Sequence, residues 1–218
     1  MSHVVLLGDS IFDNERYVPG GPPIIEQLRT WLPKGWRATL LARDGAVAGD
    51  VPKQLARLPA EATHLVVSAG GNNALENSTI VEDGSRSAAE GFMVVAEIQQ
   101  QFRQEYRDML RAVLAVGKPT VLCTIYDTLP EFPAATITAL SIFNDVILRE
   151  GFAHGLPILD LRLICTEARD YSNCIEPSER GGAKIVRGIC RVLMGHDFRQ
   201  TQSVVWTHDP VGQQPASQ

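Results

Sequence analysis

The chain has 218 residues and a net charge of −5, and 44% of its residues are hydrophobic. This composition is typical of one globular domain, which we expect over residues 1–206, followed by a polar tail over 207–218. The mild acidity argues against a nucleic-acid partner, which would require a basic face. No apolar run is long enough to span a membrane, and four scattered cysteines suit a reducing compartment. We therefore expect a cytoplasmic protein with no membrane partner.

Five short apolar runs alternate with helical patterns along the chain. The runs predict buried strands at 3–7, 37–42, 64–69, 119–124 and 157–161. Apolar residues three and four apart predict helices over about 22–31, 87–116, 138–152 and 182–194. A break near Gly91 in the helix over 87–116 is left open. A further short helix is expected to start near Asp50. Strands that are apolar throughout and joined by helices indicate a five-stranded parallel sheet in a three-layer αβα sandwich.

Small polar residues follow three of the predicted strands, at the edge where parallel sheets place their sites. Ser10 follows the first strand, Gly49 lies after the second, and Asn72 follows the third. A serine hydroxyl can attack an acyl carbon, and the charge that develops on the carbonyl oxygen needs preorganised donors. The backbone N–H groups of Ser10 and Gly49 and the Asn72 amide could supply three. Asp9, beside the serine, is expected to organise the turn.

These blocks carry a family resemblance. VVLLGDSIFDN, AVAGDV and VVSAGGNNAL, followed by FNDVI and PILDL, resemble the successive blocks of the SGNH (GDSL) hydrolase family over about residues 3–195. The resemblance implies a flavodoxin-like fold, Ser10 as the nucleophile of an acyl-enzyme, and an oxyanion hole of Ser10, Gly49 and Asn72. Asn73 stands where the family usually has aspartate. The implied function is a serine esterase for a small carboxylic ester or acetylated substrate, with no cofactor and no metal.

The family's last block, D-x-x-H, lacks both of its catalytic residues in this chain. In the register that fits Pro177, Asn173 replaces the aspartate and Glu176 replaces the histidine. A second register uses Asp170 and puts Asn173 at the histidine position. We expect Glu176 to act as base or orienter, because burial can raise the pKa of a glutamate toward a useful value.

We expect no histidine to take the place of the missing one. The single exception left open is His208, in the tail, which could fold back onto the site. The other four lie at strand starts or after helices: His3, His64, His154 and His196. Arg43, at the end of the second strand, could stabilise the oxyanion or pair with Glu176. Alternatively, it forms a strand-end salt bridge with Asp44.

The missing histidine leaves other functions open. A ligand-binding protein on an impaired hydrolase fold would hold a carboxylate, phosphate or acetyl group, and an acyltransferase would use the same serine. A nucleotide binder is disfavoured because no glycine-rich phosphate loop follows the first strand. Three apolar side chains after the fourth strand suggest an acyl pocket: Tyr126, Leu129 and Phe132. Residues 78–87 could form a lid or rim of the site. Residues 13–15 are interpreted as a solvated turn. A homo-oligomer is left open.

Overall fold

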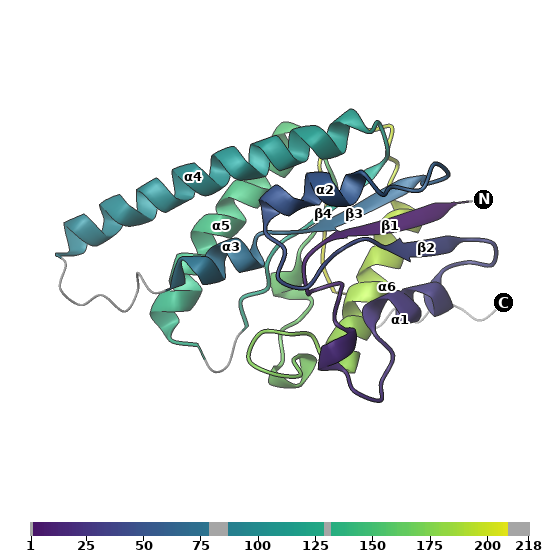
Figure 1. The fold of residues 1–218 in the computed structure, drawn as a ribbon, viewed down its shortest axis with the longest axis horizontal. Coiled ribbons are helices and arrows are strands. Elements are labelled where there is room, and N and C mark those ends of the chain that lie inside the picture. The colour runs from purple at the N-terminus through teal and green to yellow at the C-terminus, as the bar shows by residue number, and fades with distance from the viewer. Residues whose placement is uncertain (1, 79–86, 129–131, 209–218) are drawn as a thin grey trace.

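Six parallel strands form the centre of the molecule, with helices on both faces (Figure 1). The computed structural model describes residues 2–78, 87–128 and 132–208. Along the sheet the strands run in the order β2 (Arg37–Leu40), β1 (His3–Gly8), β3 (His64–Ser68), β4 (Thr120–Cys123), β5 (Ile158–Leu159) and β6 (Val205–Trp206). The helices are α1 (Ile24–Trp31), α2 (Val51–Leu55), α3 (Gly71–Glu76), α4 (Ala88–Ala115), α5 (Ala134–Ala153) and α6 (Glu179–Gly195). The predicted αβα sandwich with a parallel sheet is confirmed.

The predicted number of strands was one too few. β6 pairs with β5 through the hydrogen bonds from Ile158 N to Val204 O (2.9 Å) and from Asp160 N to Trp206 O (2.8 Å). It has two residues, lies at the sheet edge and is partly exposed, so it lacks the buried apolar run by which the other strands were recognised. The strand forms because β5 offers unpaired backbone groups at the sheet edge. This cause lies in the tertiary structure rather than in the local sequence.

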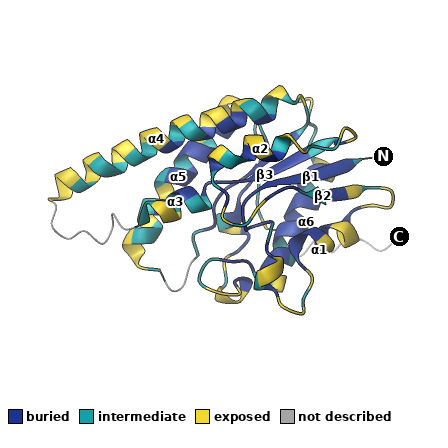
Figure 2. Ribbon diagram, in the orientation of Figure 1, coloured by how far each residue is buried: buried dark blue, intermediate teal, exposed yellow. Residues whose placement is uncertain are grey.

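The two faces of the sheet bury alternate side chains of the same strands. In β1, Val4 and Leu6 pack in the core with α1 and α6, whereas Val5 and Leu7 pack in the core with α2, α4 and α5. All four are fully buried, and Figure 2 shows the central strands as the most buried part of the molecule. This two-sided burial explains why the strands are apolar at every position rather than at alternate ones.

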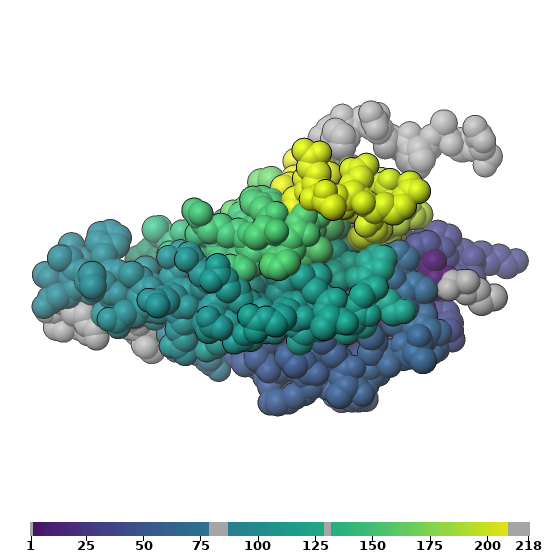
Figure 3. All heavy atoms as spheres, turned by 90° about the horizontal axis from the view of Figure 1, so that it is seen from above, coloured from purple at the N-terminus to yellow at the C-terminus, as the bar shows by residue number. Residues whose placement is uncertain are grey.

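The helix ends follow local capping signals. α4 starts after Ser87, whose side chain accepts from the Glu90 backbone N–H (3.3 Å) while the Glu90 carboxylate accepts from the Ser87 backbone N–H (2.8 Å). This helix passes through Gly91 without a break, and its amino-terminal end extends beyond the sheet (Figure 1). In the space-filling view the same end projects at one side of the molecule (Figure 3). α5 and α6 begin three to four residues earlier than predicted, α5 directly after Pro133. Within the described ranges, no helix is both long and apolar enough to cross a bilayer.

Candidate active site

The turn that carries Ser10 depends on Gly8 at the end of β1. Gly8 has φ +124°, and a Cβ at this position would lie 1.6 Å from the Ser68 carbonyl oxygen of the neighbouring strand. Only glycine tolerates both conditions. The buried Gln54 side chain then bonds both backbone groups of Gly8, accepting from its N–H and donating to its carbonyl, each at 2.8 Å. The chain therefore leaves the sheet in a single direction and places Ser10 at the sheet edge.

Ser10 is 8% exposed, and Asp9 shapes the turn around it. The Asp9 carboxylate accepts from the Ile11 N–H (3.2 Å), and the Asp9 carbonyl accepts from the N–H groups of Phe12 and Asp13. None of the described residues accepts a hydrogen bond from the Ser10 backbone N–H. That donor remains available for a developing oxyanion.

Asn72 and Asn73, at the start of α3, tie the turn that contains Gly49 to the sheet edge. The Asn72 amide donates to the Ala46 carbonyl (2.9 Å), which leaves its second N–H for another acceptor. The Asn73 side chain accepts from the Ala48 N–H (2.9 Å) and donates to Glu105 (3.0 Å). An ionised aspartate at position 73 could not donate the second bond, so the asparagine amide suits the acceptor Glu105 on α4.

Glu176 lies on a loop that several side chains hold in place. The Asn173 side-chain oxygen accepts from the backbone N–H groups of Ile175 (2.9 Å) and Glu176 (2.7 Å). The Glu176 carbonyl accepts from Ser172 N (2.8 Å), and the Tyr126 hydroxyl donates to the Ile175 carbonyl. These bonds orient the Glu176 backbone from both sides and leave its side chain directed to the pocket that Ser10 also lines.

Two buried carboxyl groups flank Ser10. Glu176 is 4% exposed, and burial raises its pKa to about 7, although an interaction with the Ser10 hydroxyl lowers it. This pair does not form a hydrogen bond of ordinary length and angle in the structure. Burial and the charge of Glu176 also raise the pKa of Asp9 to about 7. Asp9 Oδ2 and Glu176 Oε2 are both buried without a hydrogen-bond partner, so each carboxyl retains an unused acceptor.

A pocket of about 830 Å³, counting the space at its mouth, opens beside these groups. Asp9, Ser10, Gly71, Asn72 and Glu176 line its inner part. The rest of the lining comes mainly from α3, α4, α5 and the segments after β4, with these further residues: Ile11, Ala74, Leu75, Asn77, Ser78, Val95, Ile98, Ile125, Tyr126, Phe132, Thr136, Ala139, Leu140, Ile142, Phe143 and Ile175. Of the three residues suggested for an acyl pocket, Tyr126 and Phe132 are in this lining, and Leu129 lies outside the described residues.

The structure brings Ser10, Asn72 and Glu176 to one pocket and leaves two other candidates outside its lining. Gly49 is exposed in a short 3-10 turn, Ala48–Asp50, and a Cβ there would meet no atom within 4 Å. Arg43 is exposed, and no described residue makes an ion pair or side-chain hydrogen bond with it. The expected pairings of Arg43 with Asp44 or Glu176 are absent, because Asp44 instead binds Arg16 (2.9 Å) and the Tyr17 hydroxyl.

The second register of the last block places its residues elsewhere. Asp170 is fully buried, but its carboxylate is bound by Lys184 (2.6 Å) and Arg180 (3.3 Å) of α6, and it does not line the pocket. None of the five histidines lines the pocket either. His208 lies against the Leu163 carbonyl (3.1 Å), away from Ser10, and His64 stacks on Trp36. Among the described residues, no group of three His, Cys, Asp or Glu side chains could hold a metal ion.

Several amides that organise the site were not recognised in the sequence. The sequence predicts a solvated turn at Asn14, but this residue is fully buried. Its side chain accepts from the Ile24 N–H at the start of α1 (2.9 Å) and donates to the Pro177 carbonyl (3.3 Å) beside Glu176. Asn144 of α5 similarly bonds both backbone groups of Ile125, each at 2.8 Å. A lone Asn or Gln carries no periodic signal, so only the folded chain reveals these contacts.

The fold of this chain is similar to that of solved lipases and GDSL lipolytic proteins. A lipase from a goat-rumen metagenome superposes with a TM-score of 0.68 at 16% identity, covering 86% of this chain and 95% of that one. A GDSL lipolytic protein from Veillonella parvula has a TM-score of 0.65 at 13% identity, covering 89% and 98%. Phospholipase A1 from Streptomyces albidoflavus has a TM-score of 0.63 at 17% identity, covering 90% and 99%. By sequence, no family model and no curated protein matches the chain.

Proposed function

We propose that the protein is a serine hydrolase of small carboxylic esters that uses Glu176 in place of the usual histidine. The observation that carries the proposal is the burial of the Glu176 carboxyl beside Ser10, which raises its pKa to about 7. A solvated glutamate, with a pKa near 4.5, would be a weak base at neutral pH. With a pKa near neutrality, the carboxylate is both substantially ionised and able to accept a proton, which is what general-base catalysis requires.

In the proposed reaction the Ser10 oxygen attacks the ester carbonyl carbon while its proton passes to the Glu176 carboxylate. The Ser10 backbone N–H and the free N–H of the Asn72 amide donate to the developing oxyanion. Glu176 then returns the proton to the departing alkoxide, and an acyl-enzyme remains on Ser10. In the second half, water gives a proton to Glu176 and attacks the acyl carbon; the bond to the Ser10 oxygen breaks, Glu176 returns the proton to that oxygen, and the acid leaves. Gly49 does not line the pocket, so the proposed oxyanion hole has two donors rather than three.

The charge of the pocket favours this function over the binding of an anion. None of the described residues that line the pocket is Lys, Arg or His, and both charged residues in the lining are carboxyls. A free carboxylate or phosphate ligand would meet like charge with no compensating cation. A neutral ester brings no charge to the pocket until the transition state, when the donors at Ser10 and Asn72 are in place.

The test is hydrolysis of p-nitrophenyl butyrate by the wild type and four variants. We expect Ser10→Ala to abolish turnover above the uncatalysed rate and Glu176→Gln to lower kcat by about 10²–10⁴-fold. The matched controls are Ser141→Ala and Glu26→Gln, because Ser141 and Glu26 are exposed and lie outside the pocket. Mass spectrometry after treatment with an organophosphate ester should show one adduct on Ser10. Full activity in Glu176→Gln would remove the glutamate from the mechanism.

An acyltransferase would use the same acyl-enzyme and differs only in the acceptor. Adding methanol or glycerol during turnover separates the two, because a transferase forms the new ester in preference to the free acid. We expect the acid to remain the main product.

A further inference from the structure

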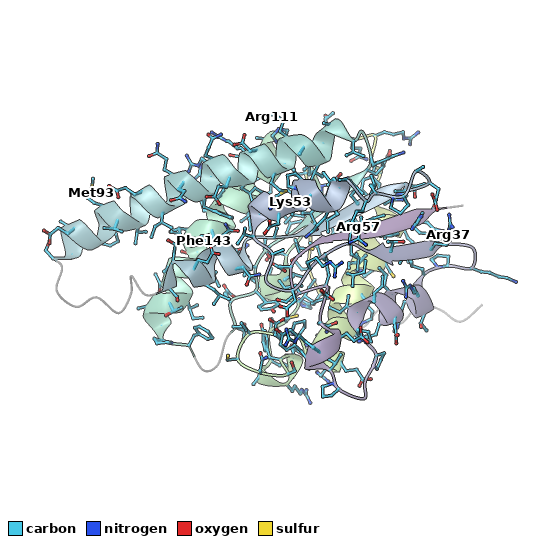
Figure 4. All side chains as sticks on the ribbon, in the orientation of Figure 1. Arg37, Lys53, Arg57, Met93, Arg111 and Phe143 are labelled. Carbon is cyan, nitrogen blue, oxygen red and sulfur yellow. The ribbon has the colours of Figure 1, made fainter. Side chains whose placement is uncertain are left out.

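The pocket that begins at Ser10 continues past the reacting groups, between the helices on one face of the sheet. Val95 and Ile98 line this outer part from α4, and Ala139 and Leu140 line it from α5. Figure 4 shows Phe143, another lining residue, on α5 beneath α4, whereas Met93 lies on the outer side of α4. The chemistry proposed at Ser10 needs only the inner part, so this extension calls for a separate explanation.

The outer part has the surface properties of a hydrocarbon-binding site. Among the described residues, its polar lining consists of the uncharged side chains Asn77, Ser78 and Thr136, and the two carboxyls of the lining belong to the inner part. Burying a polar or charged group there would cost free energy without a charged partner, whereas a methylene chain would gain from leaving water. The extension therefore suits an apolar chain.

The acyl side of the ester is the part that a buried extension can usefully hold. After Ser10 is acylated, the alcohol leaves to solvent, whereas the acyl group stays attached to Ser10 until water releases it. A chain held through both steps stabilises both transition states. Ala139 has the smallest α5 side chain in the lining, so a larger side chain at this position would shorten the space available.

We infer that the outer part of the pocket binds the acyl chain of the ester and that Ala139 determines the longest chain accepted. This inference rests on the proposed function. The substrates of this site are thus uncharged esters of medium-length saturated acids rather than acetyl esters.

The test compares p-nitrophenyl acetate, butyrate and octanoate. In the wild type we expect kcat/KM to rise by up to about fourfold for each added methylene that becomes buried. Ala139→Phe should lower kcat/KM on octanoate far more than on acetate, and Val95→Trp, from the facing helix, should act in the same direction. Ala135→Phe is the matched control, because Ala135 is exposed on α5 and lies outside the lining. Equal effects of Ala139→Phe on acetate and octanoate would overturn the inference.

Two further arms separate the possible failures. Octyl acetate carries the long chain on the alcohol side. If kcat/KM is higher for octyl acetate than for p-nitrophenyl octanoate, and Ala139→Phe removes this preference, the assignment of the pocket to the acyl chain is overturned. If no ester is hydrolysed, 1-octanol serves as a non-reacting probe of the pocket. A rise in Tm with 1-octanol in the wild type but not in Ala139→Phe would support the chain site while rejecting the esterase function. No rise in either protein would reject the chain site.

Discussion

The Asn173 side-chain oxygen accepts from the backbone N–H of Glu176 at 2.7 Å, so the two residues that the sequence resemblance aligns with the last-block aspartate and histidine are in direct contact. The contact is to the backbone rather than to the carboxyl. Asn173 therefore does not relay charge to the base in the way that an aspartate does with histidine. It shapes the loop, and burial supplies the change in proton affinity that Glu176 needs.

Removing the hydrogen bond between Asn173 and the Glu176 backbone should make the position of the Glu176 side chain less well defined. We expect Asn173→Ala to lower kcat by about tenfold with little change in KM, and to cost about 1 kcal/mol of unfolding free energy, since two backbone N–H groups lose their acceptor. Steady-state kinetics and urea denaturation measure both. Asn173→Asp keeps the acceptor oxygen and should restore most of the stability. Wild-type kcat in Asn173→Ala would show that the loop needs no such support.

The activity should rise with pH through neutrality. Glu176 must be ionised to accept the proton, and its pKa is about 7, so kcat/KM should fall about tenfold per pH unit below that value. The charge of Glu176 raises the pKa of Asp9, and the repulsion between two charges is mutual, so Asp9→Asn should move the profile to lower pH. Asp108→Asn, a change of an exposed residue on α4, is the control. A profile that Asp9→Asn leaves in place would contradict the coupling.

Folding stability should show the opposite trend with pH. The pKa values of Asp9 and Glu176 are raised from 3.8 and 4.5 to about 7, so the folded state binds more protons than the unfolded state between these limits. The resulting stabilisation is complete below the unfolded pKa values and is lost as the pH rises through about 7.

The measurement is the unfolding free energy at about pH 5 and about pH 8. It is made on the wild type and on the double variant that combines Asp9→Asn with Glu176→Gln. The lowered pKa values of His3, His64 and His196 act in the other direction, since they stabilise the fold as the pH rises. They are common to both proteins, so the difference between the two isolates the carboxyl pair. The double variant should lose less stability than the wild type between the two pH values. An equal loss in both would rule out proton uptake by the pair.

Asn72 offers a test of the oxyanion contribution. Asn72→Ala removes the side-chain donor, and we expect kcat to fall by about 10²–10³-fold with KM changed far less. The same change removes the bond to the Ala46 carbonyl, so thermal unfolding should accompany the kinetics. A loss confined to Tm, with wild-type kcat below the transition, would assign Asn72 a structural role only.

Two glycines near the site should respond in opposite ways to alanine. Gly8→Ala forces a Cβ to within 1.6 Å of a backbone oxygen at φ +124°, so we expect a loss of more than about 3 kcal/mol of unfolding free energy or failure to fold. Gly49→Ala meets no atom within 4 Å and keeps its backbone N–H, so stability and kcat should stay close to wild type. Circular dichroism melts and esterase rates measure both. A normal Tm in Gly8→Ala would contradict the steric account.

The sequence by itself determined the sheet and the serine. Strands that are apolar at every position can be buried only between two helical layers, and the polar residues that follow them necessarily meet at one edge, so Ser10 and Asn72 could be placed from pattern alone. The sequence also assigned Gly49 and Arg43 to the site, but neither lines the pocket, because both are exposed on loops whose course depends on tertiary contacts such as Asp44 with Arg16.

Only the tertiary structure decided the state of Glu176. Its usefulness as a base depends on burial, which is contributed by a loop held through Asn173, Tyr126 and Asn14, from three separate parts of the chain. The same is true of the apolar extension, whose walls come from α3, α4 and α5. Residue type and spacing identify which groups are available, whereas the pKa of a carboxyl and the shape of a pocket depend on what else the fold brings against them.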